Sequence, residues 1–315
     1  NIIIDSRTCS ISSENIINKK FNIKKKVDPC YLLKSKKNPS EIKNMIKSHV
    51  EDGVALTKFL FWIKNKSNSR LTELKAEKKL EQFRKKSNNY LYPSFNTISG
   101  SGPNGAIIHY KASKKTNRTL KMGELYLVDS GGQYLFGTTD VTRTVSLENK
   151  SNFIKEVYTR VLKGHIAVSN FKIKKRTTGS DVDKKARKFL KEVNLDYPHG
   201  TGHGVGYFLN VHEGPQSISK YYKGFLDDGI VMSNEPGFYK EGSFGIRIEN
   251  LIYLKRNKFH ELTLVPIEKS LIKRKMLNKE EINWINNYHY KVFRKLKKFM
   301  NQEEKIELFK ACSPV

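Results

Sequence analysis

Hydrophobic residues along the chain recur first at a helical spacing and later at a strand spacing. After Pro39 and Ser40, apolar positions repeat every three or four residues as far as Leu60, and this pattern predicts a long amphipathic helix. A second helix is expected over 71–85. Further on, short runs rich in Ile, Leu, Val, Tyr and Thr predict strands over 106–110, 124–129, 133–136 and 141–145.

The second half of the chain repeats this order of helices followed by strands. The predicted elements are helices over 153–171 and 181–193, strands over 229–232 and 244–254, and helices over 279–299 and 303–310. Blocks of helices and strands, instead of a strict alternation of the two, favour an α+β fold with a largely antiparallel sheet.

The pattern also divides the chain into three parts. Residues 1–28 combine a short apolar strand with Asn-rich stretches and the run Lys24-Lys25-Lys26, and we interpret them as the remnant of an upstream domain and a linker. The chain begins with Asn, so we expect that a segment once preceded it. Residues 29–266 are expected to form the main domain. Residues 267–315 are expected to form a helical extension that either packs as an appendage or contributes to a homodimer surface.

Composition narrows the class of protein. Apolar residues make up 37% of the 315 positions, and no run reaches the roughly 18 to 20 apolar residues that cross a bilayer. Three scattered cysteines support neither a disulfide framework nor a thiolate zinc site, and no signal peptide is recognisable, so we expect a cytoplasmic protein. The net charge is +28, but the lysines are spread among Asn and Ile without a basic stripe, which argues against a nucleic-acid partner.

A set of acidic and imidazole side chains stands in short motifs rich in Gly, Ser, Thr and Pro. Its members are Asp129 in LVDSGG, Asp140 in GTTDVTRT, His203 in HGTGHGVG, Glu235 in SNEPGFY and Glu249 in GIRIENL. Each alone is explained as a turn or capping residue. Along 125–129, however, strand alternation places Asp129 on the same face as Leu125 and Leu127, so a carboxylate ends an apolar row.

Several acids that point into a core need a cation, because burying an unpaired carboxylate costs several kcal/mol. Four carboxylates and one imidazole form a hard, oxygen-rich ligand set that suits Mn²⁺, with Zn²⁺ or Co²⁺ as alternatives. Two such ions about 3.5 to 4 Å apart can activate water and polarise a carbonyl. The residues therefore predict two divalent metal ions and metal-assisted hydrolysis.

Four longer segments carry a resemblance to a known family: LVDSGGQYLFGTTDVTRTV, HGTGHGVGYFLNVHEGPQ, VMSNEPGFY and GIRIENL. They resemble the M24 metallopeptidases of the pita-bread fold, specifically the Xaa-Pro aminopeptidases (aminopeptidase P). The extension after residue 266 is similar to that of the cytosolic eukaryotic-type branch. The resemblance implies a curved antiparallel sheet covered by helices, and it implies that residues 29–266 form a metallopeptidase catalytic domain.

The resemblance also implies a role for each matching residue. Asp129 would bind the first metal ion, Asp140 and Glu249 would bridge both ions, and His203 and Glu235 would complete the second. His109, His199 and His212 would line the substrate pocket, with His109 and His212 also acting in catalysis as hydrogen-bond donors. Arg247 would bind near the substrate and orient the carboxylate of Glu249, although a surface ion pair is the simpler interpretation.

The implied reaction is removal of the first residue of a peptide whose second residue is proline. A metal-bridging hydroxide would attack the scissile carbonyl while Glu235 passes a proton to the leaving nitrogen. A prolidase-type dipeptidase or a methionine aminopeptidase would use the same ligands, and these alternatives stay open. A non-catalytic pita-bread module that binds protein or nucleic acid is the alternative from another class, and such modules typically lose metal ligands.

Overall fold

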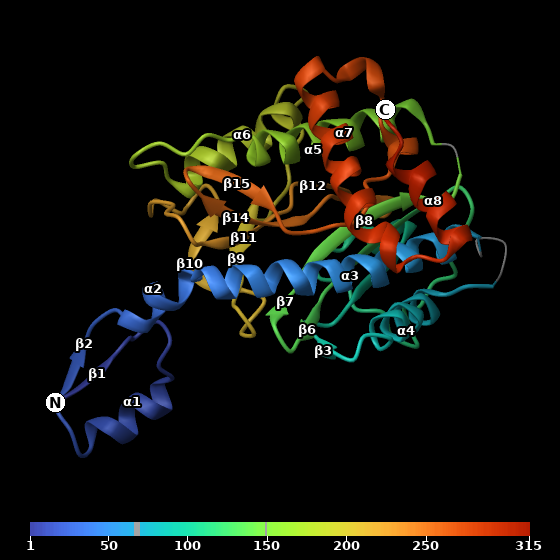
Figure 1. Cartoon of the computed structure of the whole chain (residues 1–315). Coiled ribbons are helices and arrows are strands. Elements are labelled where there is room, and N and C mark those ends of the chain that lie inside the picture. Colours follow the sequence, from blue (N-terminus) through green and yellow to red (C-terminus); the bar gives the residue numbers. More distant parts are fainter. Residues whose placement is uncertain (66–69, 149) are drawn as a thin grey trace.

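The computed structural model describes residues 1–65, 70–148 and 150–315. A small N-terminal unit projects from a much larger body (Figure 1). The unit consists of β1 (Ile2–Ile4), α1 (Ile11–Asn18) and β2 (Ile23–Lys25), and its two strands pair in parallel. The apolar strand is as predicted, but α1 was not expected, because its isoleucines at 11, 16 and 17 do not follow a helical repeat.

Two helices form one wall of the body. A short helix, α2 (Pro29–Ser35), leads from the N-terminal unit into the long α3 (Pro39–Asn65), and α4 (Glu73–Arg84) follows. The predictions of helices from Pro39 and over 71–85 are therefore confirmed. Both helices pack their apolar faces on a sheet, and the shared core includes Leu56, Phe59, Leu80, Tyr126 and Val128.

The strands of the body pair antiparallel and surround the centre of the molecule. A first sheet has the order β4 (Ile98–Ser101), β5 (Leu125–Ser130), β8 (Val141–Ser146). A second has the order β10 (Glu213–Ile218), β9 (Gly202–Gly204), β11 (Val231–Asn234), β14 (Asn250–Lys255), β15 (Lys258–Glu261). The hairpin of β12 (Gly237–Lys240) and β13 (Phe244–Arg247), and the sheet of β3 (Tyr90–Pro93), β6 (Gly132–Tyr134) and β7 (Gly137–Thr138), complete the set.

The first two sheets meet between β8 and the start of β14. Here the Glu249 N–H donates a hydrogen bond of 3.2 Å to the Thr142 carbonyl. Because Thr142 follows Asp140 by two residues, this backbone bond brings two of the predicted metal ligands to the same place.

Helices cover the other side of the strands. They are α5 (Asn152–Ser169), α6 (Gly179–Lys191), α7 (Lys279–Leu296) and α8 (Gln302–Cys312), which lie above the strands or at the right-hand edge in Figure 1. Their common core joins Val161 and Leu162 to Ile246 of β13 and to Ile285 and Leu308 of the C-terminal helices. Helices on both sides of antiparallel strands confirm the predicted α+β class.

The C-terminal helices are tied to the strands through a buried arginine. Arg143 is fully buried in β8, and its guanidinium donates hydrogen bonds to the carbonyls of Val265 and Pro266 at 2.8 and 3.1 Å. The same group donates to the Glu249 carbonyl at 2.6 Å and to the Tyr288 hydroxyl of α7 at 2.9 Å. The predicted division of the chain at 28 and 266 stays a prediction, and this network crosses its second boundary.

Two strand predictions differ from the structure. Residues 106–110 were predicted as a strand, but the segment follows a 3₁₀ turn, η1 (Gly102–Ala106), and lies outside the strands. Gly102 has a φ of +53° and Pro103 has no N–H to donate, so the chain turns there and does not pair. The strand expected over 244–254 is two strands, because the pairing stops at Ile248 and Glu249.

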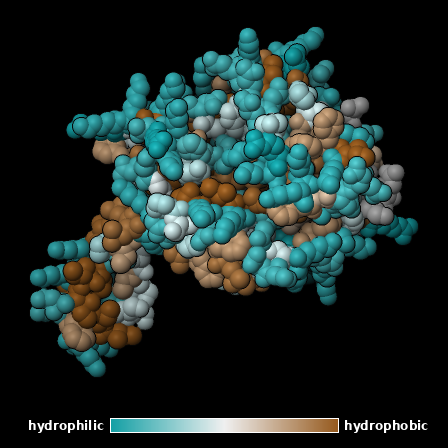
Figure 2. Space-filling model, in the orientation of Figure 1, coloured by the Kyte–Doolittle hydropathy of each residue, from teal (hydrophilic) through white to brown (hydrophobic). Residues whose placement is uncertain are grey.

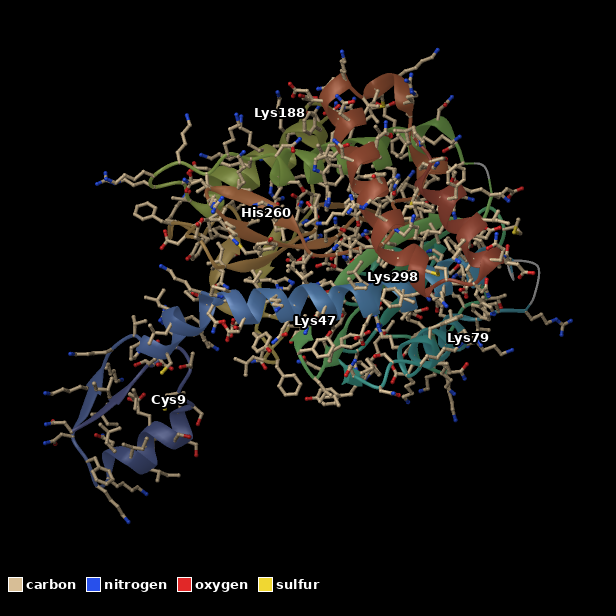
Figure 3. The ribbon with its side chains drawn as sticks, viewed as in Figure 1. Cys9, Lys47, Lys79, Lys188, His260 and Lys298 are labelled. Carbon is tan, nitrogen blue, oxygen red and sulfur yellow. The ribbon has the colours of Figure 1, made fainter. Side chains whose placement is uncertain are left out.

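The visible surface is mostly hydrophilic, and apolar side chains gather on the N-terminal unit (Figure 2). Exposed apolar residues of that unit include Ile3, Ile11, Ile16 and Phe21. On the body, Lys47, Lys79, Lys188 and Lys298 project from different elements (Figure 3). All three cysteines are free. Within the described ranges, no helix has both the length and the apolar character that a bilayer crossing requires.

Candidate metal centre

Strand ends place the predicted ligands. Asp129 lies near the end of β5 and Asp140 directly before β8, while Glu249 occupies the break between β13 and β14 and Glu235 follows β11. His203 is the central residue of β9. Because these strands are neighbours, side chains that are up to 120 positions apart in the chain converge at one point.

The convergence is tight enough for metal ions. Candidate ligand atoms fall into groups whose atoms all lie within 4.8 Å of one another: Asp129, Asp140 and Glu249; His203, Glu235 and Glu249; and Asp140, His203 and His212. The first two groups contain all five predicted ligands and share Glu249. A carboxylate that belongs to both groups is placed as a bridge between two ions would require.

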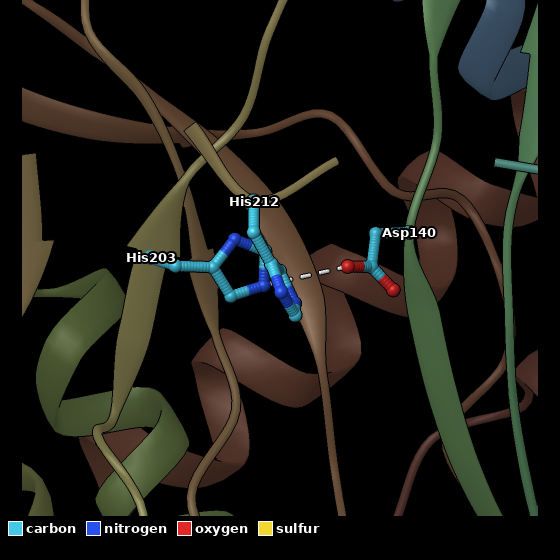
Figure 4. Close-up of side chains that lie close together, drawn as sticks. All are labelled: Asp140, His203 and His212. Atoms are coloured by element: carbon cyan, nitrogen blue, oxygen red, sulfur yellow. Dashed lines mark ion pairs between the residues drawn. The ribbon is translucent and has the colours of Figure 1, made fainter. Parts of the chain in front are cut away.

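The third group adds His212, which the sequence analysis assigned to the substrate pocket and to catalysis but not to the metal ions. His203 Nε2 lies 3.4 Å from the Asp140 carboxylate, and the rings of His203 and His212 meet edge to face with centroids 4.1 Å apart (Figure 4). His203 Nε2 is also 3.4 Å from Glu235 Oε1. No spacing pattern in the sequence distinguishes a metal-binding from a substrate-binding role for His212, since both roles need an imidazole at the cavity.

The acids are buried without enough protein charge to neutralise them. Asp129, Asp140 and Glu249 are 8%, 3% and 1% exposed. Burial, followed by repulsion from Asp129, raises the pKa of Asp140 well above its usual value, and burial together with the charge of Asp140 does the same for the pKa of Glu249. Burial also raises the pKa of Glu235.

Two oxygens in this cluster lack a partner among the described residues, Asp129 Oδ1 and Asp140 Oδ1. Buried polar atoms in proteins normally have a hydrogen-bond partner. Carboxylate oxygens that have none, and that lie beside other carboxylates, indicate a site for a cation. The donor set of carboxylate oxygens and imidazole nitrogen therefore fits a pair of hard or borderline divalent ions.

A buried guanidinium holds part of the cluster in place. Arg247 is 2% exposed and its Nη2 donates to Asp129 Oδ2 at 2.6 Å. Its Nε donates to the Thr142 hydroxyl at 3.1 Å, and Thr142 in turn donates to Glu249 Oε2 at 2.7 Å. Arg247 was expected to orient Glu249 directly, but the strand break turns Glu249 away, and Thr142 relays the contact. The surface ion pair, the simpler interpretation of Arg247, does not describe a side chain this buried.

Thr142 and Tyr239 are contributors that the sequence analysis did not name. The Tyr239 hydroxyl accepts a hydrogen bond of 2.6 Å from Arg247 Nη1 and lies 2.8 Å from His199 Nε2. Strand alternation offered a signal for Thr142, because it shares a face with Asp140 two residues earlier. Tyr239 follows Pro236-Gly237 on β12, and only the folded hairpin brings it to Arg247.

The cluster opens into a cavity of about 430 Å³. His109, His199 and His212 line it together with the five predicted ligands and Arg247. Burial lowers the pKa of His199 to about 3, and partial burial beside His203 lowers the pKa of His212 to about 4, so both rings are neutral at pH 7 in the metal-free protein. The structure thus brings every predicted site residue to one cavity.

The glycines on either side of His203 are required by the packing of β9. A Cβ on Gly202 would collide with the Ser233 carbonyl of β11, and one on Gly204 with the Glu213 carbonyl of β10. Glycine is needed there because β9 is squeezed between its two neighbouring strands.

Comparison with known proteins identifies the family. The sequence matches metallopeptidase family M24 over residues 43–256 and the C-terminal region of peptidase M24 over residues 255–315. The chain belongs to metallopeptidase family M24. In this M24 chain the match begins within α3 and continues to the last residue.

Relatives with curated names support the narrower resemblance to Xaa-Pro aminopeptidases. Xaa-Pro aminopeptidase 1 of Dictyostelium discoideum is 45% identical over 87% of this M24 chain and 47% of its own length. Aminopeptidase P2 of Arabidopsis thaliana is 43% identical over 85% of this chain and 40% of that protein. The chain therefore spans about half the length of the curated relatives it matches.

Solved structures of X-prolyl aminopeptidases are also similar to this chain. An X-prolyl aminopeptidase from Caenorhabditis elegans, described as a cytosolic enzyme with a di-nuclear active site, has a TM-score of 0.89 and 37% identity, covering 93% of this chain and 51% of that one. An X-Pro aminopeptidase from Thermotoga maritima has a TM-score of 0.76 and 29% identity, covering 85% and 73%. The pita-bread fold and the likeness to a eukaryotic-type Xaa-Pro aminopeptidase are confirmed.

Proposed function

We propose that this chain is the catalytic part of a metal-dependent aminopeptidase that hydrolyses the bond between the first residue of a peptide and a proline at the second position. The observation that carries the proposal is the pair of ligand groups that share Glu249 at the floor of an open cavity. The relatives named Xaa-Pro aminopeptidase 1 and aminopeptidase P2, which match 87% and 85% of this chain, support the choice of substrate.

In this proposal, Asp129 would hold one ion, His203 and Glu235 would hold the other, and Asp140 and Glu249 would serve both. When bound, two divalent cations lower the pKa of a shared water and polarise the scissile carbonyl. Mn²⁺ is the metal we propose, and Zn²⁺ and Co²⁺ would fit the same donors.

Glu235 moves the proton. Its Oε1 accepts a 3.1 Å hydrogen bond from the Ser233 hydroxyl, and its Oε2 lies 4.0 Å from His199 Nδ1 at the cavity wall. These contacts leave the carboxylate between the ligand cluster and the open space. From there it can take a proton from the attacking water and deliver it to the leaving proline nitrogen.

The remaining histidines bind and orient the substrate. His109 and His212 are both exposed to the cavity, where an imidazole N–H can donate a hydrogen bond to the scissile carbonyl as negative charge develops on its oxygen. His199 and Arg247, joined through the Tyr239 hydroxyl, form the wall against which the first residue lies. Proline is selected by shape, since its nitrogen carries no hydrogen to donate.

The setting of the enzyme completes the proposal. We propose a cytoplasmic homodimer that acts on peptides and takes no nucleic-acid partner. The free cysteines suit a reducing compartment. The lysines are spread along the sequence among Asn and Ile, which does not favour binding to a phosphate backbone.

One paired experiment tests the activity. Protein purified without chelator is analysed for metal, and hydrolysis is then compared for an Xaa-Pro-Yaa tripeptide, an Xaa-Pro dipeptide and a Met-Ala-Ser tripeptide, with and without added Mn²⁺. We expect two metal ions per chain and release of the first residue from Xaa-Pro-Yaa alone. Preference for the dipeptide would establish a prolidase, and preference for Met-Ala-Ser a methionine aminopeptidase. Absence of metal and of all hydrolysis would leave a binding module.

A further inference from the structure

The strand that follows His212 is fixed by a buried ion pair with a distant part of the chain. Lys37 Nζ lies 2.7 Å from Glu213 Oε2, and each side chain is 1% exposed. Glu213 is the first residue of β10, whereas Lys37 belongs to the short connection between α2 and α3. In Figure 1, α2 lies beside β10 at the point where the N-terminal unit joins the body.

The same junction is closed by further contacts. Lys34 of α2 reaches Glu213 Oε1 at 3.3 Å. The Lys37 N–H donates to the Gly229 carbonyl at 2.8 Å, which fixes the connection itself. Tyr31 packs so closely on Gly214 that a Cβ there would collide with its ring. Residues of the segment 29–37 therefore contact both Glu213 and Gly214 at the beginning of β10.

These contacts are important because Glu213 directly follows the cavity residue His212. His212 is adjacent to Glu213, and Glu213 pairs with Gly204, the neighbour of His203. The rings of His203 and His212 meet 4.1 Å apart. The loop before His212 has no regular structure and carries Phe208 at a φ of +53°. Among the described contacts, the His212 ring has no hydrogen bond of its own, so its backbone anchor decides where it points.

We propose that Lys37 and Glu213 are positioning residues that hold the imidazole of His212 against His203 at the cavity. The buried charges then serve a purpose that stability alone does not require, since apolar residues of similar volume can replace a buried ion pair with little loss or even a gain in stability. The segment before α3, which carries no reacting group, thereby supports the active site. The kinetic part of this inference rests on the proposed peptidase activity.

The decisive variant replaces both partners. Lys37→Met with Glu213→Gln removes both charges while keeping shape, and so avoids leaving one buried charge unpaired. We expect kcat for an Xaa-Pro-Yaa peptide to fall about 10- to 100-fold, because a misplacement near 1 Å has that cost, with KM within about threefold. Lys36→Met is the matched control: it breaks the neighbouring Lys36 to Asp227 pair, whose side chains are 53% and 59% exposed, and should leave kcat unchanged.

A double-mutant cycle separates positioning from general weakening. In a His212→Ala background, the Lys37→Met, Glu213→Gln pair should have almost no further effect on kcat, because the group that it positions is gone. A fully additive loss of kcat would overturn the proposal. So would wild-type kcat in the protein that carries the pair alone.

A spectroscopic readout does not depend on activity. In metal-free protein labelled with ¹⁵N-histidine, the His212 ring signal is assigned by its loss in His212→Ala. We expect this signal to shift or broaden in the double variant and to stay in place in Lys36→Met. Glu213→Gln alone is milder, leaves Lys37 an acceptor, and should shift the signal less in the same direction. An unchanged His212 signal in both variants would overturn the proposal. If the wild type cleaves no peptide, the proposed function fails, while this measurement still decides the positioning role.

Discussion

Two parts of the candidate centre are built in different ways: the buried acids, here called the acidic half, and the cavity-facing histidines His109 and His212, here called the imidazole half. Asp129, Asp140 and Glu249 sit at the ends of paired strands, are almost completely buried, and repel one another. His109 and His212 stand on irregular segments at the open side of the cavity. The acidic half is rigid and electrostatically unfavourable until it is neutralised, whereas the imidazole half needs no ion but depends on anchors behind it.

The difference shows how one fold can serve two needs. Metal ligands must be placed within a few tenths of an ångström, and a hydrogen-bonded sheet provides that precision. Substrate-contacting groups must face solvent, where loops lie, so their precision comes from neighbouring residues held in the interior. Glu73 illustrates this for His109: its fully buried carboxylate accepts hydrogen bonds of 2.7 Å from the Tyr110 hydroxyl and the Ser101 N–H, on either side of the loop.

Substitution of Asp140, a carboxylate proposed to serve both metal ions, should reduce activity the most. We expect Asp140→Asn to lower kcat/KM about a thousandfold or more, because even residues behind metal ligands commonly cost 10- to 100-fold. Metal content should fall below two ions per chain by elemental analysis. Asp227→Asn, which alters an exposed acid, is the matched control. Unchanged metal content in Asp140→Asn would remove Asp140 from the ligand set.

Removal of metal should reveal the repulsion in the acidic half. At a metal concentration of a hundred times Kd, binding of each ion adds about 2.7 kcal/mol to the free energy of unfolding, which chelation removes. The folded-state pKa values of Asp140 and Glu249 are raised, so the metal-free fold binds extra protons.

This proton binding sets the pH dependence. The contribution of Asp140 and Glu249 to the free energy of unfolding should be fully present below the ordinary carboxyl pKa, about 4, and should be lost as pH rises through their raised folded-state pKa values. The lowered pKa values of His199 and His212 act in the opposite direction, but they do so in every form of the protein, so the forms are compared with one another. Calorimetry from pH 5 to 8 should show that chelated wild type loses stability relative to chelated Asp140→Asn and relative to metal-loaded wild type as pH rises. The same pH dependence in all three would mean that the acids are not the cause.

A substitution in the imidazole half should reduce activity without loss of metal, in contrast to Asp140→Asn. We expect His212→Ala to reduce kcat about 100-fold, the usual cost of one donor to a developing oxyanion, while two metal ions stay bound. Titration with Mn²⁺ alongside kinetics checks both expectations. His260→Ala, an exposed histidine remote from the cavity, is the control. Loss of a metal ion in His212→Ala would show that His212 is a ligand, as its place in the third atom group would allow.

The smallest loss of activity should come from changing Tyr239, which joins Arg247 beside the acidic half to His199 on the cavity wall. Tyr239→Phe leaves Arg247 Nη1 and His199 Nε2 without their shared hydroxyl. We expect about a tenfold loss of kcat/KM, mostly through KM, the size of one hydrogen bond to a charged group. Tyr253→Phe on β14, whose ring stacks on His260 away from the cavity, is the control. A loss that appears only in kcat would place Tyr239 in the chemical step.

Much of this arrangement is visible in the sequence, and the reason is local. The apolar repeat from Pro39 to Leu60 predicts α3, and the motifs around Asp129 and Asp140 mark acids at strand ends. What the sequence does not show is non-local. The choice of Asp129 as the partner of Arg247 depends on a strand break at 248–249 that no residue pattern there announces.

Anchors are harder to recognise than ligands. Glu73 reads as a first-turn helix acid and Lys37 as one more lysine in a lysine-rich chain. Only the packing of distant segments shows that both are buried. The segment 106–110 failed for a related reason: its apolar residues suggest a strand, but the turn at Gly102-Pro103 leaves it no partner strand.

The bonds of Arg143 limit how far this protein can be shortened. A version ending after residue 266 would lose the C-terminal helices and the Tyr288 hydroxyl, which accepts a hydrogen bond from the Arg143 guanidinium next to Glu249. Anyone who designs a minimal form must therefore redesign position 143 along with the cut. Removal of the C-terminal helices would otherwise disturb the buried residues around Glu249.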